Sequence, residues 1–177
     1  ISLQYGSYTA KHARAQSIAA GDSVVDPTIT NRSYKDKTVT ATNSTDLKTI
    51  LDTKAAMGGK PVIVSLALLN PAIVAEFEKE VQGIIASFGV QDQALLDIIS
   101  GAAMPSGLLP VQMPANMKTV EEQNEDVPHD MECHVDSEAH KYDFAFGLNW
   151  NGVIKDARTI KYGKHPKKIE NKLSLRK

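Results

Sequence analysis

The sequence predicts an α/β fold: a three-layer sandwich with a largely parallel, flavodoxin-like sheet. Two observations lead to this prediction. Between residues 43 and 114, short apolar runs alternate with segments whose apolar residues recur at helical spacing, which is typical of right-handed β–α–β crossovers. The run at residues 61–66 is apolar at nearly every position, as expected of a strand that is covered on both faces.

The first predicted element of this segment is a helix that begins at Ser44 or Thr45, either of which could cap it. Gly58 and Gly59 would end the helix, because glycine readily adopts the left-handed conformation that follows many helix C-termini. The apolar residues at helical spacing, which would pack on the sheet, are Leu47, Ile50, Leu51 and Ala55.

A second helix is predicted after the strand at residues 61–66. Asn70 and Pro71 suit its N-cap and its first position. An apolar side at helical spacing would then face the sheet. This side comprises Ile73, Val74, Phe77 and Val81.

The remaining elements of the segment follow the same alternation. Residues 83–88 form a second short apolar run and are predicted to be a strand. A third helix is predicted over residues 94–99, with Gly101 placed to end it, and a last strand over residues 109–113. Three strands joined by helices would all run parallel in one sheet.

The rest of the chain is expected to be less regular. Residues 1–42 would form an irregular N-terminal segment that continues from an upstream strand, with a short helix over residues 8–20. Residues 43–154 would form the α/β sandwich domain, and residues 155–177 a basic C-terminal tail. Residues 115–140 show neither helical nor strand period, so they are expected to form a long loop.

Composition limits the classes of function. A length of 177 residues with 42% hydrophobic content suits one globular domain. The net charge of −1 argues against a nucleic-acid partner, which normally requires a basic face. No apolar run reaches the roughly 18 residues of a membrane-spanning helix, so no membrane contact is expected. The chain begins with Ile1 rather than Met, which indicates a fragment of a longer polypeptide.

Two segments resemble a known enzyme family. Residues 101–114 include Pro-Ser-Gly-Leu-Leu-Pro-Val and end in Pro, and they are similar to a pattern of glycoside hydrolase family 3. Residues 142–150 read Tyr-Asp-Phe-Ala-Phe-Gly-Leu-Asn-Trp and resemble the Tyr-Pro-Phe-Gly-Tyr-Gly-Leu-Ser-Tyr signature of the same family. Asp143, Ala145 and Trp150 replace the Pro, the first Gly and the last Tyr of that signature.

Two shorter segments agree with this resemblance. Residues 60–64, followed by Asn-Pro at 70–71, are similar to the family's Pro-Val-Val-Val strand and the turn after it. Residues 87–91 resemble its Trp-Tyr-Pro-Gly-Gln stretch, although Asp-Gln-Ala at 92–94 replaces the usual Glu-Gly-Gly. The resemblance covers roughly residues 43–151.

The resemblance implies the second, C-terminal domain of a β-glucosidase-like enzyme that cleaves β-linked glucosyl or related sugars with retention. Retaining glycosidases use two carboxyl groups about 5–5.5 Å apart. In this family the nucleophile lies on an N-terminal barrel domain, and the acid/base follows a Val-rich strand; neither pattern occurs here. Both catalytic carboxylates are therefore expected outside this chain, which would pack on the barrel domain and complete its carbohydrate pocket.

The same resemblance implies no organic cofactor and favours a secreted or periplasmic protein, whereas the spacing of the histidines and the cysteine predicts no metal site. The histidines near Cys133 lack the Cys-x-x-Cys and His-Glu-x-x-His spacings of zinc sites. A thiol nucleophile is disfavoured as well, because Cys133 and His134 are adjacent and would point to opposite sides of an extended segment. Cys133 is therefore interpreted as a buried, inert residue.

Four residues are predicted to contact the sugar. Asn70 and Gln91 each follow a predicted strand, and ligands of open parallel sheets bind at the carboxyl ends of the strands. His129 and Asp130 are the best candidates for side chains that reach the pocket from the acidic loop. The alternative for that loop is a solvated segment without a role in binding. The aromatic cluster at residues 144–150 fits either packing or a sugar-stacking platform.

A second function remains open. The chain could be a non-catalytic carbohydrate- or protein-interaction domain that has kept the fold and lost the chemistry. The replaced Glu-Gly-Gly and the missing upstream strand favour this alternative, whereas the start at Ile1 favours a truncated enzyme more strongly. Surface character would distinguish the two, because a large exposed apolar surface indicates a domain that packs on another part of an enzyme. A well-covered polar surface would indicate an independent domain.

Overall fold

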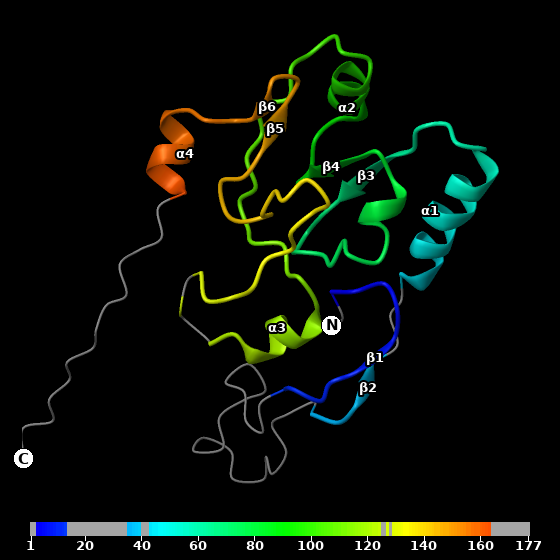
Figure 1. The fold of residues 1–177 in the computed structure, drawn as a ribbon, viewed down its shortest axis with the longest axis vertical. Helices are drawn as coiled ribbons and strands as arrows, with labels where there is room; N and C mark the ends of the chain where they lie inside the picture. The colour runs from blue at the N-terminus through cyan, green and yellow to red at the C-terminus, as the bar shows by residue number, and fades with distance from the viewer. Residues whose placement is uncertain (1–2, 14–34, 40–42, 125–126, 128, 164–177) are drawn as a thin grey trace, which may run out of the picture.

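The computed structural model is of the α/β class, with helices beside a small parallel sheet. Strands β3 (Ile63–Ala67) and β4 (Gly83–Ser87) lie at the centre of the molecule, α1 (Ser44–Ala56) lies to one side, and α2 (Asp92–Ile99) lies at one end (Figure 1). The structure describes residues 3–13, 35–39, 43–124, 127 and 129–163.

The two central strands confirm the predicted strands at residues 61–66 and 83–88. They pair in parallel, with Ile63 opposite Gly83 and Ala67 opposite Ser87. The pairing extends one residue beyond the strands, because Leu68 N donates to Ser87 O at 2.8 Å. Parallel pairing requires a crossover connection between the strands.

The predicted third layer is not observed in the described part of the chain. Burial alternates along β3, where Val64 and Leu66 are buried while Ile63, Ser65 and Ala67 are exposed. The expectation of a strand covered on both faces is therefore wrong for these residues. One face of the sheet packs on the core, and the opposite face is open.

The core lies between β3, the crossover and the N-terminal segment. Phe77 is 1% exposed, and its ring meets that of Tyr5 edge-to-face at 5.5 Å. Leu47 and Ile50 of α1 pack against this core, as the helical spacing predicted. The buried cluster comprises Tyr5, Val64, Leu66, Leu68, Ala72, Val74, Phe77 and Met113.

The helix predicted over residues 70–81 is wrong, although the predicted burial of its apolar residues is largely confirmed. The segment contains only a short 3₁₀ helix, η2 (Glu78–Glu80). Ala72, Ile73 and Val74 are consecutive and all buried, which one face of an α-helix could not achieve. Ile73 N donates to Leu3 O at 2.9 Å, so the N-terminal segment covers the side that a helix would have left to solvent.

The helices α1 and α2 confirm two predictions and their glycine stops. The predicted cap at Ser44 or Thr45 is wrong, because both residues lie inside α1 and its N-cap is Asn43, whose side chain makes no capping bond. Gly58 and Gly59 follow α1 with φ of +57° and +89°, and Gly101 follows α2 with φ of +79°. These positive φ values lie in the region that glycine adopts at low cost, which explains why each helix ends where it does.

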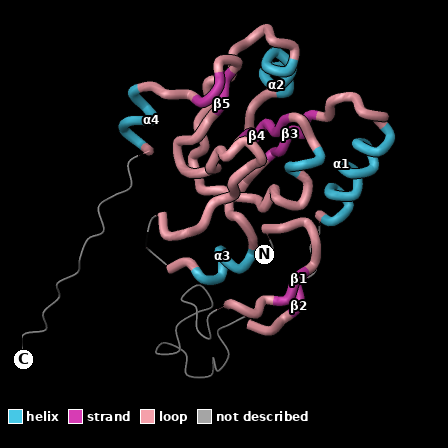
Figure 2. Tube along the Cα trace, in the orientation of Figure 1, coloured by secondary structure: helices cyan, strands magenta, loops and turns pink. Residues whose placement is uncertain are grey.

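The other elements are short. β1 (Tyr8–Thr9) pairs antiparallel with β2 (Thr38–Val39), so the helix predicted over residues 8–20 is wrong at its start, and the rest of it lies outside the described residues. Much of the chain after α2 is loop (Figure 2). The remaining elements are α3 (Met117–Glu122), β5 (Leu148–Asn149), β6 (Gly152–Val153) and α4 (Ala157–Tyr162). None of the described helices is long and apolar enough to span a membrane.

Two of these helices were not expected from the sequence. α3 lies in the predicted loop at 115–140, where the Asn116 side chain accepts from Thr119 N at 3.0 Å and caps it. α4 lies at the start of the predicted basic tail and is fixed by a capping box between Asp156 and Thr159. Both helices are only six residues long, so their capping residues are a stronger signal than their periodicity.

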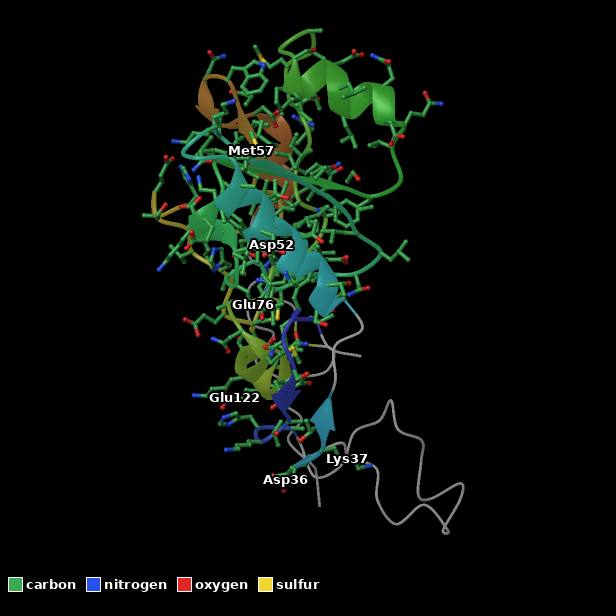
Figure 3. All side chains as sticks on the ribbon, turned by 90° about the vertical axis from the view of Figure 1, so that its right-hand side faces the viewer. Asp36, Lys37, Asp52, Met57, Glu76 and Glu122 are labelled. Atoms are coloured by element: carbon green, nitrogen blue, oxygen red, sulfur yellow. The ribbon has the colours of Figure 1, made fainter. Side chains whose placement is uncertain are left out.

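Glu76, labelled in Figure 3, attaches the N-terminal segment to the crossover. Its two carboxylate oxygens accept from Tyr5 N at 2.6 Å and from Gly6 N at 2.9 Å. Hydrogen bonds to an ionised acceptor are stronger than neutral ones. This carboxylate therefore positions Tyr5 against the core.

The segment predicted as a last strand does not join the sheet. Residues 109–113 run instead between two later segments, 142–146 and 132–134. Toward residues 142–146, Leu109 N donates to Phe146 O at 2.7 Å, and Ala145 N donates to Leu109 O at 2.9 Å. Toward residues 132–134, His134 N donates to Met113 O at 2.9 Å. The two family-like motifs are thus adjacent in space.

Within the second motif, Ala145 has φ of +66° and is 7% exposed. A left-handed conformation costs a residue with a Cβ about 1–2 kcal/mol, whereas glycine adopts it freely. The structure therefore accounts for the glycine that the resembling signature has at this position.

Ala145→Gly is accordingly expected to raise the free energy of unfolding by about 0.5–1 kcal/mol, since relief of backbone strain exceeds the added entropy of the unfolded chain. Urea unfolding followed by the fluorescence of Trp150, the one tryptophan, would measure this. Ala103→Gly, at a residue without positive φ, should instead lower stability. A loss of stability in Ala145→Gly as well would contradict the strain argument.

Candidate functional site

A cleft of about 540 Å³ lies at the carboxyl end of β3, between this strand and the first turns of α1. Its volume is within the usual range of ligand pockets. Residues 64–69, which belong to β3 and the turn directly after it, line one side of the cleft. The side chains that line the rest of the cleft include Leu3, Tyr5, Asn43, Asp46, Thr49, Ile50, Asn70 and Pro71.

The polar groups of the cleft come from three separate segments. Asn43 and Asp46 lie at the start of α1, three positions apart and therefore on the same side of the helix. Asn70 follows β3, and its Nδ2 donates to Pro71 O at 3.0 Å. Burial raises the pKa of Tyr5, and the nearby carboxylates of Asp46 and Glu76 raise it further, so its hydroxyl stays protonated. Amide, carboxylate and hydroxyl groups together suit a ligand rich in hydroxyls.

Sequence reasoning predicted one of these residues and missed others. Asn70 was expected at the end of a strand, and the structure places it there, in the lining of the cleft. Asn43 and Asp46 were not predicted, because only the tertiary structure places α1 beside the end of β3. Their spacing of three at the start of a helix, close before a buried strand, is the signal that could have suggested them.

Gln91 lies at the same edge of the sheet as Asn70 but not in the lining of the cleft. It is exposed and is the N-cap residue of α2, immediately after the turn that follows β4. Because β3 and β4 are parallel and in register, the segments that follow them emerge at one edge. The edge placement of both residues thus agrees with the prediction, and sugar contact by either remains a prediction.

His129 and Asp130 do not line the cleft that contains Asn70. His129 has φ of +61°, and its ring meets Phe144 edge-to-face at 6.0 Å. Asp130 is exposed, and its Oδ2 accepts from Asn124 N at 2.7 Å. It lines a separate hollow of about 360 Å³ beside α3, which lies at the opposite end of the molecule from α2 (Figure 1). The structure therefore does not bring Asp130 into the cleft with Asn70.

Asp143 is the anion beside His129. His129 Nδ1 lies 3.5 Å from Asp143 Oδ1. Burial alone would raise the pKa of Asp143, but hydrogen bonds from Lys141, Phe144 N and Gln112 outweigh burial and lower its pKa to about 2. Each of these three bonds measures 2.8 Å. Asp143 therefore remains ionised at all ordinary pH values and orients the residues around it.

Asp143→Asn is expected to lower the free energy of unfolding at pH 7 by about 1 kcal/mol, a value reduced for solvent screening. Because the folded-state pKa is depressed, the stabilisation is present above the ordinary pKa of 3.8 and is lost as pH falls through about 2. The variant should thus lose less stability than the parent over this acid range. Urea unfolding at several pH values would test this, with exposed Asp52→Asn as control. Parallel pH curves for Asp143→Asn and the parent would contradict it.

Two more histidines of the loop, His134 and His140, each lie beside a carboxylate and an aromatic ring. His134 Nε2 lies 3.5 Å from Glu78 Oε2, and the His134 ring meets Tyr142 edge-to-face at 5.1 Å. His140 Nδ1 lies 3.0 Å from Asp136 Oδ2. The described residues contain no group of three or more His, Cys, Asp or Glu that could hold a metal ion. These pairs fix the loop on the core.

Cys133, Tyr142 and Phe146 have packing roles. Cys133 is 2% exposed, and burial together with nearby Asp143 raises the pKa of its thiol to about 11, which makes it a poor nucleophile at neutral pH. The rings of Tyr142 and Phe146 stack at 5.3 Å. Trp150 differs from both, because it is 57% exposed.

Comparisons with a family model and with curated proteins point to the same enzyme family. Residues 9–150 match the model of the glycosyl hydrolase family 3 C-terminal domain. β-Glucosidase C of Emericella nidulans is 37% identical over 84 residues, which are 48% of this chain and 14% of that protein. A periplasmic β-glucosidase/β-xylosidase of Dickeya chrysanthemi is 30% identical over 88 residues, which are 50% of this chain and 12% of that protein.

A probable β-glucosidase C of Aspergillus flavus is 34% identical over 90 residues, which are 51% of this chain and 13% of that protein. The aligned part of the chain therefore spans only about one seventh of the curated relatives. No solved structure matches significantly. Since the family model matches most of the chain, including both motifs that meet at Leu109, the chain belongs to glycoside hydrolase family 3 as a C-terminal domain.

Proposed function

We propose that this chain is the C-terminal domain of a β-glucosidase-like enzyme and completes the sugar pocket of a barrel domain that lies outside the described chain. The observation that carries this proposal is the cleft at the carboxyl end of β3, which combines polar and apolar lining residues and lies where open parallel sheets bind ligands. The names of the relatives point to β-linked glucosyl or xylosyl units as the substrate.

The cleft residues would bind sugar rather than break the glycosidic bond. Asp46 and Asn43 can accept hydrogen bonds from sugar hydroxyls, and amide groups such as that of Asn70 can also donate to them. The two carboxyl groups of a retaining mechanism would both come from outside the described chain. This domain would thereby orient the sugar and exclude water, without an organic cofactor.

We also propose that Gln91, His129 and Asp130 contact the substrate. A different observation supports each of these residues. Gln91 shares the sheet edge with Asn70 and is exposed. His129 is held in a left-handed conformation, and such conformations are often found at functional sites. Asp130 lines the hollow beside α3. We assign Gln91 to the rim of the cleft, whereas contacts by His129 and Asp130 would belong to a separate subsite, because Asp130 lines the hollow beside α3 and not the cleft.

The proposal also extends the fold. In the whole enzyme, further elements would cover the open face of β3, where Ile63 is 47% exposed. The sheet of residues 43–154 would then be the middle layer of a three-layer sandwich whose third layer comes from elsewhere in the enzyme, with the irregular segment at 1–42 before it and the basic tail at 155–177 after it. Parallel sheets are usually covered on both faces, which supports this extension.

Surface character favours this function over an independent interaction domain. Several large apolar side chains of the described residues are exposed, among them Leu69 at 101%, Ile160 at 65% and Trp150 at 57%. An autonomous domain would normally keep large apolar patches covered. Exposed residues of this kind are expected where a domain packs on the rest of a larger enzyme.

The test uses the full-length polypeptide that contains this chain, assayed with 4-nitrophenyl β-glucoside and β-xyloside. Asp46→Asn should lower kcat/KM about tenfold, the effect of losing about 1.4 kcal/mol of binding to the substrate. Asp52→Asn is the matched control, because Asp52 is also on α1 but does not line the cleft (Figure 3). Its kcat/KM should stay within about twofold of the parent.

Two results would count against the proposal. Full-length protein that hydrolyses neither glycoside would argue for the non-catalytic interaction domain. Hydrolysis that is equally unaffected by Asp46→Asn and Asp52→Asn would separate the cleft from the substrate. Saturation kinetics on Asn70→Ala would add independent information, since removal of a substrate contact should raise KM.

A further inference from the structure

The β5–β6 hairpin, labelled in Figure 1, carries the one Asn-Gly sequence of this chain. Asn151 stands directly before Gly152, the first residue of β6. Each of the other asparagines is followed by a residue with a side chain. The difference matters chemically, because the backbone nitrogen of the next residue can attack the carboxamide carbon of an asparagine, and a Cβ on that next residue hinders the approach.

The hairpin presents this pair of residues to solvent. Asn151 and Gly152 are both exposed. A Cβ added at Gly152 would meet no atom within 4 Å, so the space around the turn is open. Gly152 has φ of +103°, a conformation that a residue with a side chain adopts only at a cost. The turn therefore requires glycine for its backbone shape, and the same glycine leaves the backbone nitrogen unhindered.

The pairing that holds the turn is short. β5 and β6 contribute two residue pairs, Leu148 with Val153 and Asn149 with Gly152. Asn149 Oδ1 also accepts from Asn151 N at 2.8 Å, whereas no hydrogen bond within the described residues fixes the side-chain amide of Asn151. Segments held by few, exposed hydrogen bonds open locally at low free energy. Such opening lets the Gly152 nitrogen approach the Asn151 side chain.

We propose that Asn151 is a site of spontaneous deamidation, a covalent modification that needs no enzyme and no cofactor. The Gly152 nitrogen attacks Asn151 Cγ. The new N–Cγ bond forms as the Cγ–Nδ2 bond breaks, and ammonia leaves with the proton from the Gly152 nitrogen. The product is a cyclic succinimide. Water then adds to one of the ring's carbonyl carbons and opens the ring to aspartate or isoaspartate, and no atom is oxidised or reduced.

The modification changes the tip of the hairpin. Either product places a carboxylate where a neutral amide stood. In isoaspartate the backbone runs through the former side chain, so an additional carbon separates Trp150 from Gly152, and the pair of Asn149 with Gly152 loses its register. The bond from Ile154 N to Gly147 O, at 2.9 Å, closes the base of the hairpin and is kept. The change is thus confined to the tip, and it requires neither a sugar nor a partner domain.

Peptide mass spectrometry of the full-length polypeptide tests this inference. The native protein is incubated at mildly alkaline pH, sampled over time, and digested at acidic pH, at which succinimide formation is slow. Asn149 is the internal control, because it lies in the same hairpin but precedes Trp150. Asn151 should be converted at least about tenfold faster than Asn149, through an intermediate that has lost ammonia and with isoaspartate as the larger product.

Two variants check the chemistry. Asn151→Gln lengthens the side chain, so attack by the Gly152 nitrogen would have to form a larger ring, and conversion should be slower by at least about tenfold. Gly152→Ala should lower the rate as well, because the added Cβ hinders the attack. Circular dichroism confirms that the comparison is made on folded protein, and the internal control at Asn149 needs no variant.

Three results would overturn the inference. Equal rates at Asn151 and Asn149 in the native protein would show that the glycine gives no advantage. Conversion of Asn151 in urea but not in native buffer would show that the pairing of β5 with β6 protects it. Aspartate without isoaspartate would exclude the succinimide. None of these results depends on glycosidase activity, so the proposed function is tested separately by its own assay.

Discussion

Gly147→Ala is expected to lower the free energy of unfolding by about 3 kcal/mol or more. A Cβ at this position would lie 2.2 Å from Gly107 O and 3.0 Å from Leu108 Cδ2. The first of these atoms belongs to the backbone, so no side-chain rotation relieves the clash. The hydrogen bonds from Leu109 N to Phe146 O and from Ile154 N to Gly147 O hold the backbone on both sides of the contact. The chain must therefore separate the two family motifs.

Gly107→Ala is the matched control, because it changes the other glycine of the same contact. An added Cβ at Gly107 meets no atom within 4 Å, and this glycine has no positive φ. Its effect on stability should stay within about 0.5 kcal/mol. Thermal unfolding of the chain should show a lower Tm for Gly147→Ala by roughly 6–12 °C. Equal Tm values for the two variants would show that the motifs do not pack as described.

Phe77→Ala is expected to have an effect of similar size, about 3–5 kcal/mol of unfolding free energy. Phe77 is 1% exposed and contacts Tyr5 edge-to-face, so truncation leaves a cavity between the crossover and the N-terminal segment. The loss should also weaken the placement of Tyr5 in the cleft. Urea unfolding of the chain would measure the change, and the midpoint should fall without a change in slope.

Two further substitutions provide comparison values for the stability loss of Phe77→Ala. Phe77→Leu keeps most of the apolar volume and should cost roughly 1–2 kcal/mol, less than the alanine variant. Ile160→Ala removes an exposed side chain, 65% accessible, and should change stability by less than about 0.5 kcal/mol. A loss for Phe77→Ala no larger than that for Ile160→Ala would place Phe77 outside the core.

Local patterns in the sequence predicted the elements whose signals are local. The apolar runs at β3 and β4 became strands, and helical spacing with glycine stops predicted α1 and α2. The order of the motifs indicated the family that the comparison confirmed. These features depend on backbone conformation and on residues close in sequence, which a single chain displays directly.

Spacing alone did not distinguish a helix from a buried irregular segment. At residues 70–81, apolar residues at helical spacing also fit a crossover that is covered on several sides. The N-terminal segment supplies that cover, through the bond from Ile73 N to Leu3 O and through Glu76. Since these partners lie some seventy positions away in sequence, no local pattern reports them.

The sequence by itself determined the class of the fold, the strands β3 and β4, the helices α1 and α2, and the family of the chain. Only the tertiary structure decided that residues 109–113 pair with the signature segment rather than with the sheet. It likewise placed Asp46 beside Asn70 in one cleft and Asp130 in another hollow. The physical reason is the same in each case: propensity and periodicity act over a few residues, whereas pairing and burial depend on contacts between segments far apart in the chain.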